Sequence, residues 1–213
     1  MRSLDIIEAI VGDDPEITSY IVDIARWAAS MEPEDESAAI ALANKELEDF
    51  RVVFVKKDPV VSAGGRVEAD GTIRIPVDSG FYLIVRDKSF PDIIRHEYVH
   101  QEQVRHSGEA ADKMAADSYR QALNPDGSVN MEQYYLIPYE IMAYAKSTSD
   151  ELQKEGYSKD EALKLLRTKI KFDKLPYGTQ RFIYPYYARR KKHPEVWHKF
   201  LRYMVDYVRN WKQ

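Results

Sequence analysis

The segment His96-Glu97-Tyr98-Val99-His100 decides the interpretation of this chain, and helical signals surround it from Pro91 to about Gly108. Residues four apart lie on one face of a helix, so both imidazoles can bind a single metal ion. Glu97 is offset by about 100° around the helix, where its carboxylate can reach a metal-bound water and take its proton. The segment therefore predicts a metal site with its own general base in the middle of a helix.

The composition narrows the ligands that such a site can use. The chain has 213 residues, of which 44% are hydrophobic, a composition that suits one globular domain. It contains no cysteine, so the metal must be held by His, Asp or Glu, and disulfides are excluded. No apolar run reaches the roughly 20 residues needed to cross a bilayer, and residues 1–16 do not resemble a signal peptide. We expect a cytoplasmic protein with no membrane association.

A catalytic zinc site needs a third protein ligand, and two residues compete for that role. Glu140 follows Pro138, which predicts a helix start and places Glu140 in the first turn among apolar residues. A carboxylate in such surroundings needs a partner, and a metal is a sufficient one; the alternative is a first-turn carboxylate that favours the helix dipole. His106 also follows the pair closely, but on an unbroken helix it would lie about 9 Å along the axis from His100. We therefore predict Glu140 as the third ligand.

The rest of the chain predicts an α+β fold. Helical periodicity covers residues 3–50. Short β-branched or aromatic runs follow, which predict a small antiparallel meander. Helices are expected after it. We expect residues 1–50 to form an N-terminal helical segment, 51–155 a core with the metal site, and 156–213 a helical region packed on that core. The expected strands are 51–55, 66–69, 72–77 and 81–86, and the expected helices are 89–108, 109–123, 138–155, 158–171 and 194–211.

Two quoted stretches, H-E-Y-V-H-Q-E-Q and P-Y-E-I-M-A-Y-A, resemble the gluzincins, in which two histidines and a downstream glutamate bind zinc. In detail they are similar to small zincin-like proteins of bacteriophage and bacterial genomes. The resemblance covers Pro91 to about Lys146 and implies a zincin-like catalytic core. It implies Zn²⁺ at His96, His100 and Glu140, with Glu97 as general base and then proton donor to the leaving amine. The implied activity is a zinc metallopeptidase that hydrolyses peptide or protein substrates.

The same resemblance leaves other site residues open. Thermolysin has an acidic residue four positions after the glutamate, where this chain has Tyr144. We predict Tyr144 as a catalytic residue that donates to the developing oxyanion, because it lies one turn from Glu140. Other possible donors are Tyr134, Tyr135, Tyr139, Arg105 and His106. The spacing of His96, His100 and His106 resembles the metzincins, but Gln103 stands where that family has its glycine. Gln101, Glu102 and Gln103 are expected to face solvent or to orient the ligands.

Three other functions are compatible with parts of this sequence. Peptide deformylase shares the motif but uses a cysteine ligand, which this chain lacks. A structural or binding protein could keep the zinc without turnover, although the presence of Glu97 favours catalysis. Residues 167–213 hold 13 basic and 3 acidic residues, so a nucleic acid or acidic partner could bind there. We consider nucleic acid the less favoured partner, since charge runs usually form solvated surface.

Overall fold

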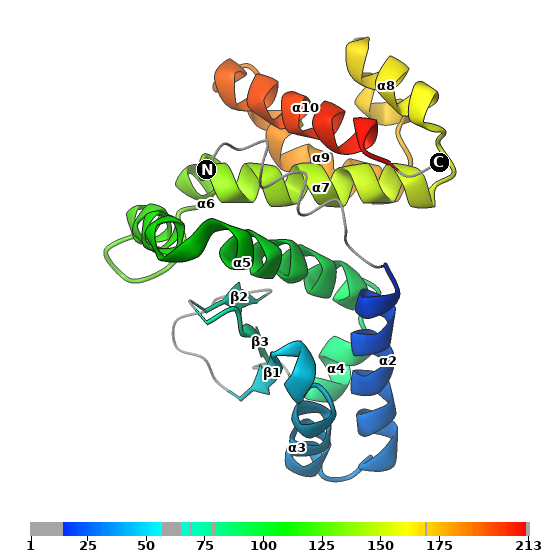
Figure 1. The fold of residues 1–213 in the computed structure, drawn as a ribbon, viewed down its shortest axis with the longest axis vertical. Helices are drawn as coiled ribbons and strands as arrows, with labels where there is room; N and C mark the ends of the chain where they lie inside the picture. The colour runs from blue at the N-terminus through cyan, green and yellow to red at the C-terminus, as the bar shows by residue number, and fades with distance from the viewer. Residues whose placement is uncertain (1–14, 57–64, 69, 78–79, 169, 212–213) are drawn as a thin grey trace. The chain divides into compact units, whose positions relative to one another are not determined.

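A computed structural model describes residues 15–56, 65–68, 70–77, 80–168 and 170–211, with the side chains of 15, 16 and 106–116 outside the description. The chain has an α+β fold that is mostly helical (Figure 1). Its described residues form two compact units, one within Asp13–Lys113 and the other within Met114–Gln213. The helix expected over residues 3–14 lies outside the described residues.

The first unit packs helices against a small sheet. Its elements are α2 (Pro15–Met31), α3 (Glu36–Glu46), the 3₁₀ helix η1 (Glu48–Phe50), β1 (Val52–Val55), β2 (Arg66–Val67), β3 (Ile73–Pro76), α4 (Phe81–Arg86) and the first part of α5 (Phe90–Gln121). Asn44 links α3 to β1, since its amide donates to Phe54 O at 3.0 Å and accepts from Phe54 N at 2.7 Å. Phe54 lies in the core with Phe81 and Phe90, at ring distances of 5.0 and 6.1 Å.

The sheet is mixed, which corrects the expected antiparallel meander. Its described strands have the order β1-β3-β2, with β2 antiparallel to β3 and β1 parallel to β3. A turn at Asp70-Gly71 precedes β3, in which Gly71 adopts a φ of +84° and Asp70 Oδ1 accepts from Thr72 N at 2.9 Å. The prediction of a strand at β1 is confirmed, but its predicted antiparallel direction is wrong. The residue pattern of a strand does not determine its direction, which depends on how the chain returns to the sheet.

The run Phe81–Arg86 is a helix, α4, and the prediction of a strand there is wrong. A short apolar run fits a buried strand or a buried helix equally well by periodicity. Phe81 and Val85, four residues apart, are both buried, as one helical face requires. Gly80 precedes the helix with a φ of +104°, so the chain turns there before α4 starts.

Helix α5 is continuous over 32 residues, where the sequence predicted one helix ending near Ser107-Gly108 and another from Glu109. A single glycine inside a helix costs only about 1 kcal/mol relative to alanine. The residues after Gly108 are good helix formers, so the helix continues through it. The motif therefore stands in the N-terminal half of one long helix.

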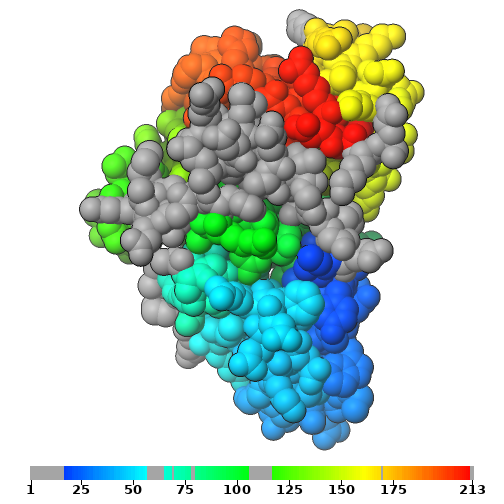
Figure 2. Space-filling view, viewed as in Figure 1, coloured from blue at the N-terminus to red at the C-terminus, as the bar shows by residue number. Residues whose placement is uncertain are grey.

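The second unit is helical. Its elements after α5 are α6 (Met131–Tyr134), α7 (Pro138–Lys154), α8 (Lys159–Arg167), η2 (Phe172–Lys174), α9 (Tyr177–Arg189) and α10 (Pro194–Arg209). Helix α10 packs on α7, α8 and α9, and α8 and α10 lie side by side (Figure 1, Figure 2). The starts predicted at Pro138 and Pro194 are confirmed. Helix α8 ends at Arg167, short of the predicted Lys171, and α9 was not predicted.

Glu132 joins α6 to the end of α9 and the start of α10. Its carboxylate lies 3.0 Å from Arg189 Nε, 2.7 Å from Lys192 Nζ and 3.0 Å from His193 Nε2. The hydrogen bond from Lys192 and the other cationic neighbours lower the pKa of Glu132 to about 2. Part of the basic C-terminal region is thus engaged inside this unit. Across the described residues, no helix combines the length and apolar character that a membrane span requires.

Candidate metal centre

His96 and His100 project from the same face of α5, as their spacing predicted. Their Nε2 atoms are 3.2 Å apart, and the rings meet edge to face with centroids 4.7 Å apart. Two nitrogens that each lie about 2.0–2.1 Å from a tetrahedral zinc ion are about 3.3 Å apart. The separation of the two imidazoles therefore suits ligation of one ion.

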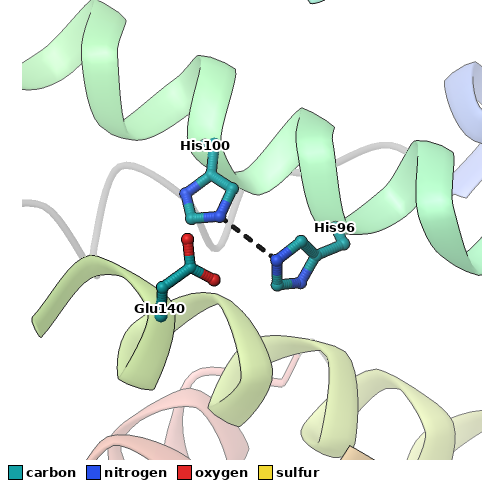
Figure 3. A group of neighbouring side chains, drawn as sticks. All are labelled: His96, His100 and Glu140. Atoms are coloured by element: carbon teal, nitrogen blue, oxygen red, sulfur yellow. Dashed lines mark hydrogen bonds between the residues drawn. The ribbon is translucent and has the colours of Figure 1, made fainter. Parts of the chain in front are cut away.

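Glu140 completes a group of three possible ligands. His96, His100 and Glu140 each offer a ligand atom, and the three atoms all lie within 4.8 Å of one another (Figure 3). In Figure 3 the carboxylate of Glu140, from α7, points toward the two imidazoles of α5. These three residues are the ones that the sequence predicted as metal ligands.

The start of α7 places Glu140. Ile137 is extended, with a ψ of 125°, and Pro138 follows as the first helical residue. Glu140 then falls in the first turn, where it is 8% exposed. Burial of a carboxylate without compensation is costly, so a cation that binds it would offset that cost. Ala143 and Ala145 on the same helix are fully buried.

Gln103 orients one of the two imidazoles. Its side-chain Oε1 lies 2.8 Å from His100 Nδ1, and Gln103 is itself 1% exposed. An amide oxygen accepts, so the proton sits on Nδ1 and the lone pair of His100 is left on Nε2, the atom that faces His96. Metal-binding histidines generally use their other ring nitrogen in this way. Gln103 is therefore not solvent-facing, and its amide contacts a predicted ligand; that it orients a bound ligand stays a prediction.

Its neighbours on α5 have structural contacts. Gln101 Nε2 donates to Phe50 O at 3.2 Å and to Gly71 O at 2.8 Å, which fastens α5 to the loops that flank the sheet. Glu102 is buried, not solvent-facing, and its carboxylate lies 3.2 Å from Arg105 Nη1. The hydrogen bonds of Gln101 thus attach the helix that carries the histidine pair to the first unit, whereas the Glu102–Arg105 pair lies within α5.

Glu97, the predicted general base, is buried at 5% exposure and packs against the backbone of Gly65. A Cβ built on Gly65 would lie 2.7 Å from Glu97 Cγ and 3.0 Å from Ile75 Cδ1. Gly65 directly precedes β2, the strand at one edge of the described sheet, so the backbone at this edge lies against the Glu97 side chain. Nothing local in the sequence around Gly65 indicated this contact with Glu97.

Tyr144 lies one turn after Glu140 on α7, within a cluster of aromatic rings. Its ring centroid is 5.5 Å from that of Tyr135 and 5.6 Å from that of Tyr186. Its role as an oxyanion donor stays a prediction. The backbone of α5 is helical through His106, as expected from Gln103, whereas the side chain of His106 lies outside the described residues.

Comparison of the chain with models of known protein families, with curated proteins and with solved structures finds no match.

Proposed function

We propose that this chain is a zinc-dependent peptidase, with zinc held by His96, His100 and Glu140. The observation that carries the proposal is the convergence of these three ligand atoms within 4.8 Å. A buried carboxylate, Glu97, follows the first of them on the same helix. This combination of two imidazoles, one carboxylate ligand and a neighbouring base is the set that metal-assisted hydrolysis requires.

The donor set fits zinc better than the other common ions. Imidazole nitrogen suits zinc, whereas magnesium and calcium prefer oxygen ligands alone. Structural zinc sites usually have four protein ligands, often cysteines, whereas catalytic zinc sites usually have three. A site with three protein ligands leaves one position for water or substrate. That difference favours catalysis over a purely structural role.

The chain's own residues would divide the work of hydrolysis. Zinc bound here would polarise the substrate carbonyl and make water more acidic. Glu97 would take a proton from the attacking water and return it to the leaving amine as the peptide bond breaks. The backbone contact at Gly65 would hold the Glu97 carboxylate in one position for both proton transfers. Tyr144 is our proposed donor to the oxygen that becomes negative.

Zinc uptake and a conservative change at Glu97 test this function together. We expect metal-free protein to bind about one zinc per chain in calorimetric titration, and Glu97→Gln to bind it as tightly. Turnover of peptide libraries by Glu97→Gln should fall by about 100-fold or more, because an amide cannot accept the proton. Protein that takes up no zinc would refute the metal site. Zinc binding with no cleavage by the wild type would favour a non-catalytic zinc protein.

A further inference from the structure

Tyr186, on α9, is one of the most completely enclosed side chains of the second unit. It is 1% exposed, and its ring stacks on Phe200 with centroids 4.5 Å apart and an interplanar angle of 14°. The rings of Tyr135 and Tyr144 meet it edge to face at 5.8 and 5.6 Å. Three aromatic neighbours therefore fix the direction in which its hydroxyl points.

That hydroxyl has no hydrogen-bond partner among the described residues. A buried hydroxyl without a partner loses its hydrogen bonds to water and gains nothing in exchange. Such groups are rare in folded proteins, and each one calls for an explanation. An acceptor that comes into reach only in another state of the protein, such as a liganded state, is one explanation.

Glu140 is a carboxylate acceptor whose charge acts on Tyr186. Glu140 lies one helical turn before Tyr144 on α7, so the two side chains share one face of that helix. The ring of Tyr144 contacts Tyr186 from this face. Burial raises the pKa of Tyr186 well above its usual value, and the charge of Glu140 raises it further. Tyr186 therefore stays protonated and can donate.

We propose that the Tyr186 hydroxyl donates a hydrogen bond to the Glu140 carboxylate in the zinc-bound protein, and so acts as a positioning residue for that ligand. The inference rests on the proposed zinc site. A carboxylate can accept up to about four hydrogen bonds on its two oxygens, so ligation by one oxygen leaves room for the tyrosine on the other. The ring is held by packing, whereas the flexible Glu140 side chain can turn to meet it.

Tyr186→Phe tests this assignment because it removes the hydroxyl and keeps the stacked ring. We expect zinc affinity, measured by competition with a chromophoric chelator, to fall by about tenfold or more, because loss of a hydrogen bond to a metal ligand generally weakens metal binding by that much. The unfolding temperature of the metal-free protein should not fall, since the hydroxyl has no partner there. Tyr207→Phe is the matched control, because Tyr207 is equally buried at 1% exposure, and it should leave zinc affinity unchanged.

A second comparison links the effect to Glu140. In a Glu140→Ala background, Tyr186→Phe should cause no further loss of zinc affinity, because the acceptor is already gone. Wild-type affinity in Tyr186→Phe would overturn the positioning role while leaving the zinc site intact. An equal loss in the presence and absence of Glu140 would overturn it as well. A wild-type protein that takes up no zinc would overturn both proposals, and that result is recognisable before any variant is made.

Discussion

Gly65 and Glu97 are in such close contact that no side chain larger than hydrogen fits between them. A Cβ on Gly65 would lie 2.7 Å from Glu97 Cγ and 2.9 Å from Glu97 Cδ. The glycine thus provides a backbone surface that contacts the proposed general base. A side chain at position 65 would push Glu97 away and so move its carboxylate relative to the two histidines.

Gly65→Ala should therefore impair turnover without removing the metal. We expect a fall of about 10- to 100-fold in kcat/KM, because a shift of about 1 Å in a reacting group can cost that much, while zinc affinity stays unchanged. Gly178→Ala is the matched control, since its Cβ would clash with the Glu151 carboxylate, away from the proposed ligands and base. That variant should lose stability but not kcat/KM per folded molecule. Equal effects of both variants on kcat/KM would contradict the role given to Gly65.

Gln103→Leu should weaken zinc binding by about 10- to 100-fold, because the group that holds the His100 proton on Nδ1 is lost. Gln101→Leu provides the comparison two residues earlier on the same helix. It removes bonds to the backbone carbonyls of Phe50 and Gly71, so it should lower the unfolding temperature more than the zinc affinity. Calorimetric titration and thermal unfolding of both variants separate the two effects. Unchanged zinc affinity in Gln103→Leu would show that this hydrogen bond does not orient the ligand.

Glu140→Ala should lose zinc affinity by at least about tenfold, since only two protein ligands remain. His106→Ala should keep it. The backbone of α5 continues as helix through Gln103 and His106, so nothing turns the chain to bring the third histidine back. Titration of both variants with zinc decides between them. If His106→Ala is the variant that loses the metal, the assignment of Glu140 is wrong.

The local parts of this architecture could be predicted from the sequence. The histidine pair, Pro138 and Pro194 mark helices by signals that act over one or two turns, and all three were placed correctly. The contact of Gln103 could also have been predicted, because residues three apart on a helix are neighbours and its amide oxygen can accept from the His100 ring nitrogen that does not face His96.

Features that depend on tertiary contact could not be predicted in this way. The direction of β1 is set by its partner β3, about 20 residues later, and not by its own side chains. Phe81–Arg86 suits a strand or a helix until its buried neighbours are known. The contact between Gly65 and Glu97 joins residues 32 apart in sequence, and no periodicity links a loop glycine to a helix carboxylate.

Glu132→Gln should change how stability depends on pH. The hydrogen bond from Lys192, together with His193 and Arg189, lowers the pKa of Glu132 from 4.5 to about 2 in the folded protein. A carboxylate with a lowered folded-state pKa stabilises the fold above its unfolded pKa, and this contribution disappears as pH falls through the folded value. The contribution of Glu132 is therefore complete at neutral pH, declines as pH falls below about 4.5, and is lost below about pH 2.

Urea unfolding of the wild type and Glu132→Gln at a series of pH values measures this contribution. At pH 7 the variant should unfold at lower urea, because its neutral amide no longer attracts Arg189, Lys192 and His193. The gap between the two midpoints should narrow steadily below pH 4.5 and close only below about pH 2, where the wild-type carboxyl becomes neutral in the folded protein as well. Glu195→Gln is the control, since this more exposed carboxylate lies 3.5 Å from His193 Nδ1 and touches the same cluster at its edge. A gap that stays constant with pH would show that Glu132 stabilises α6 by packing and not by its charge.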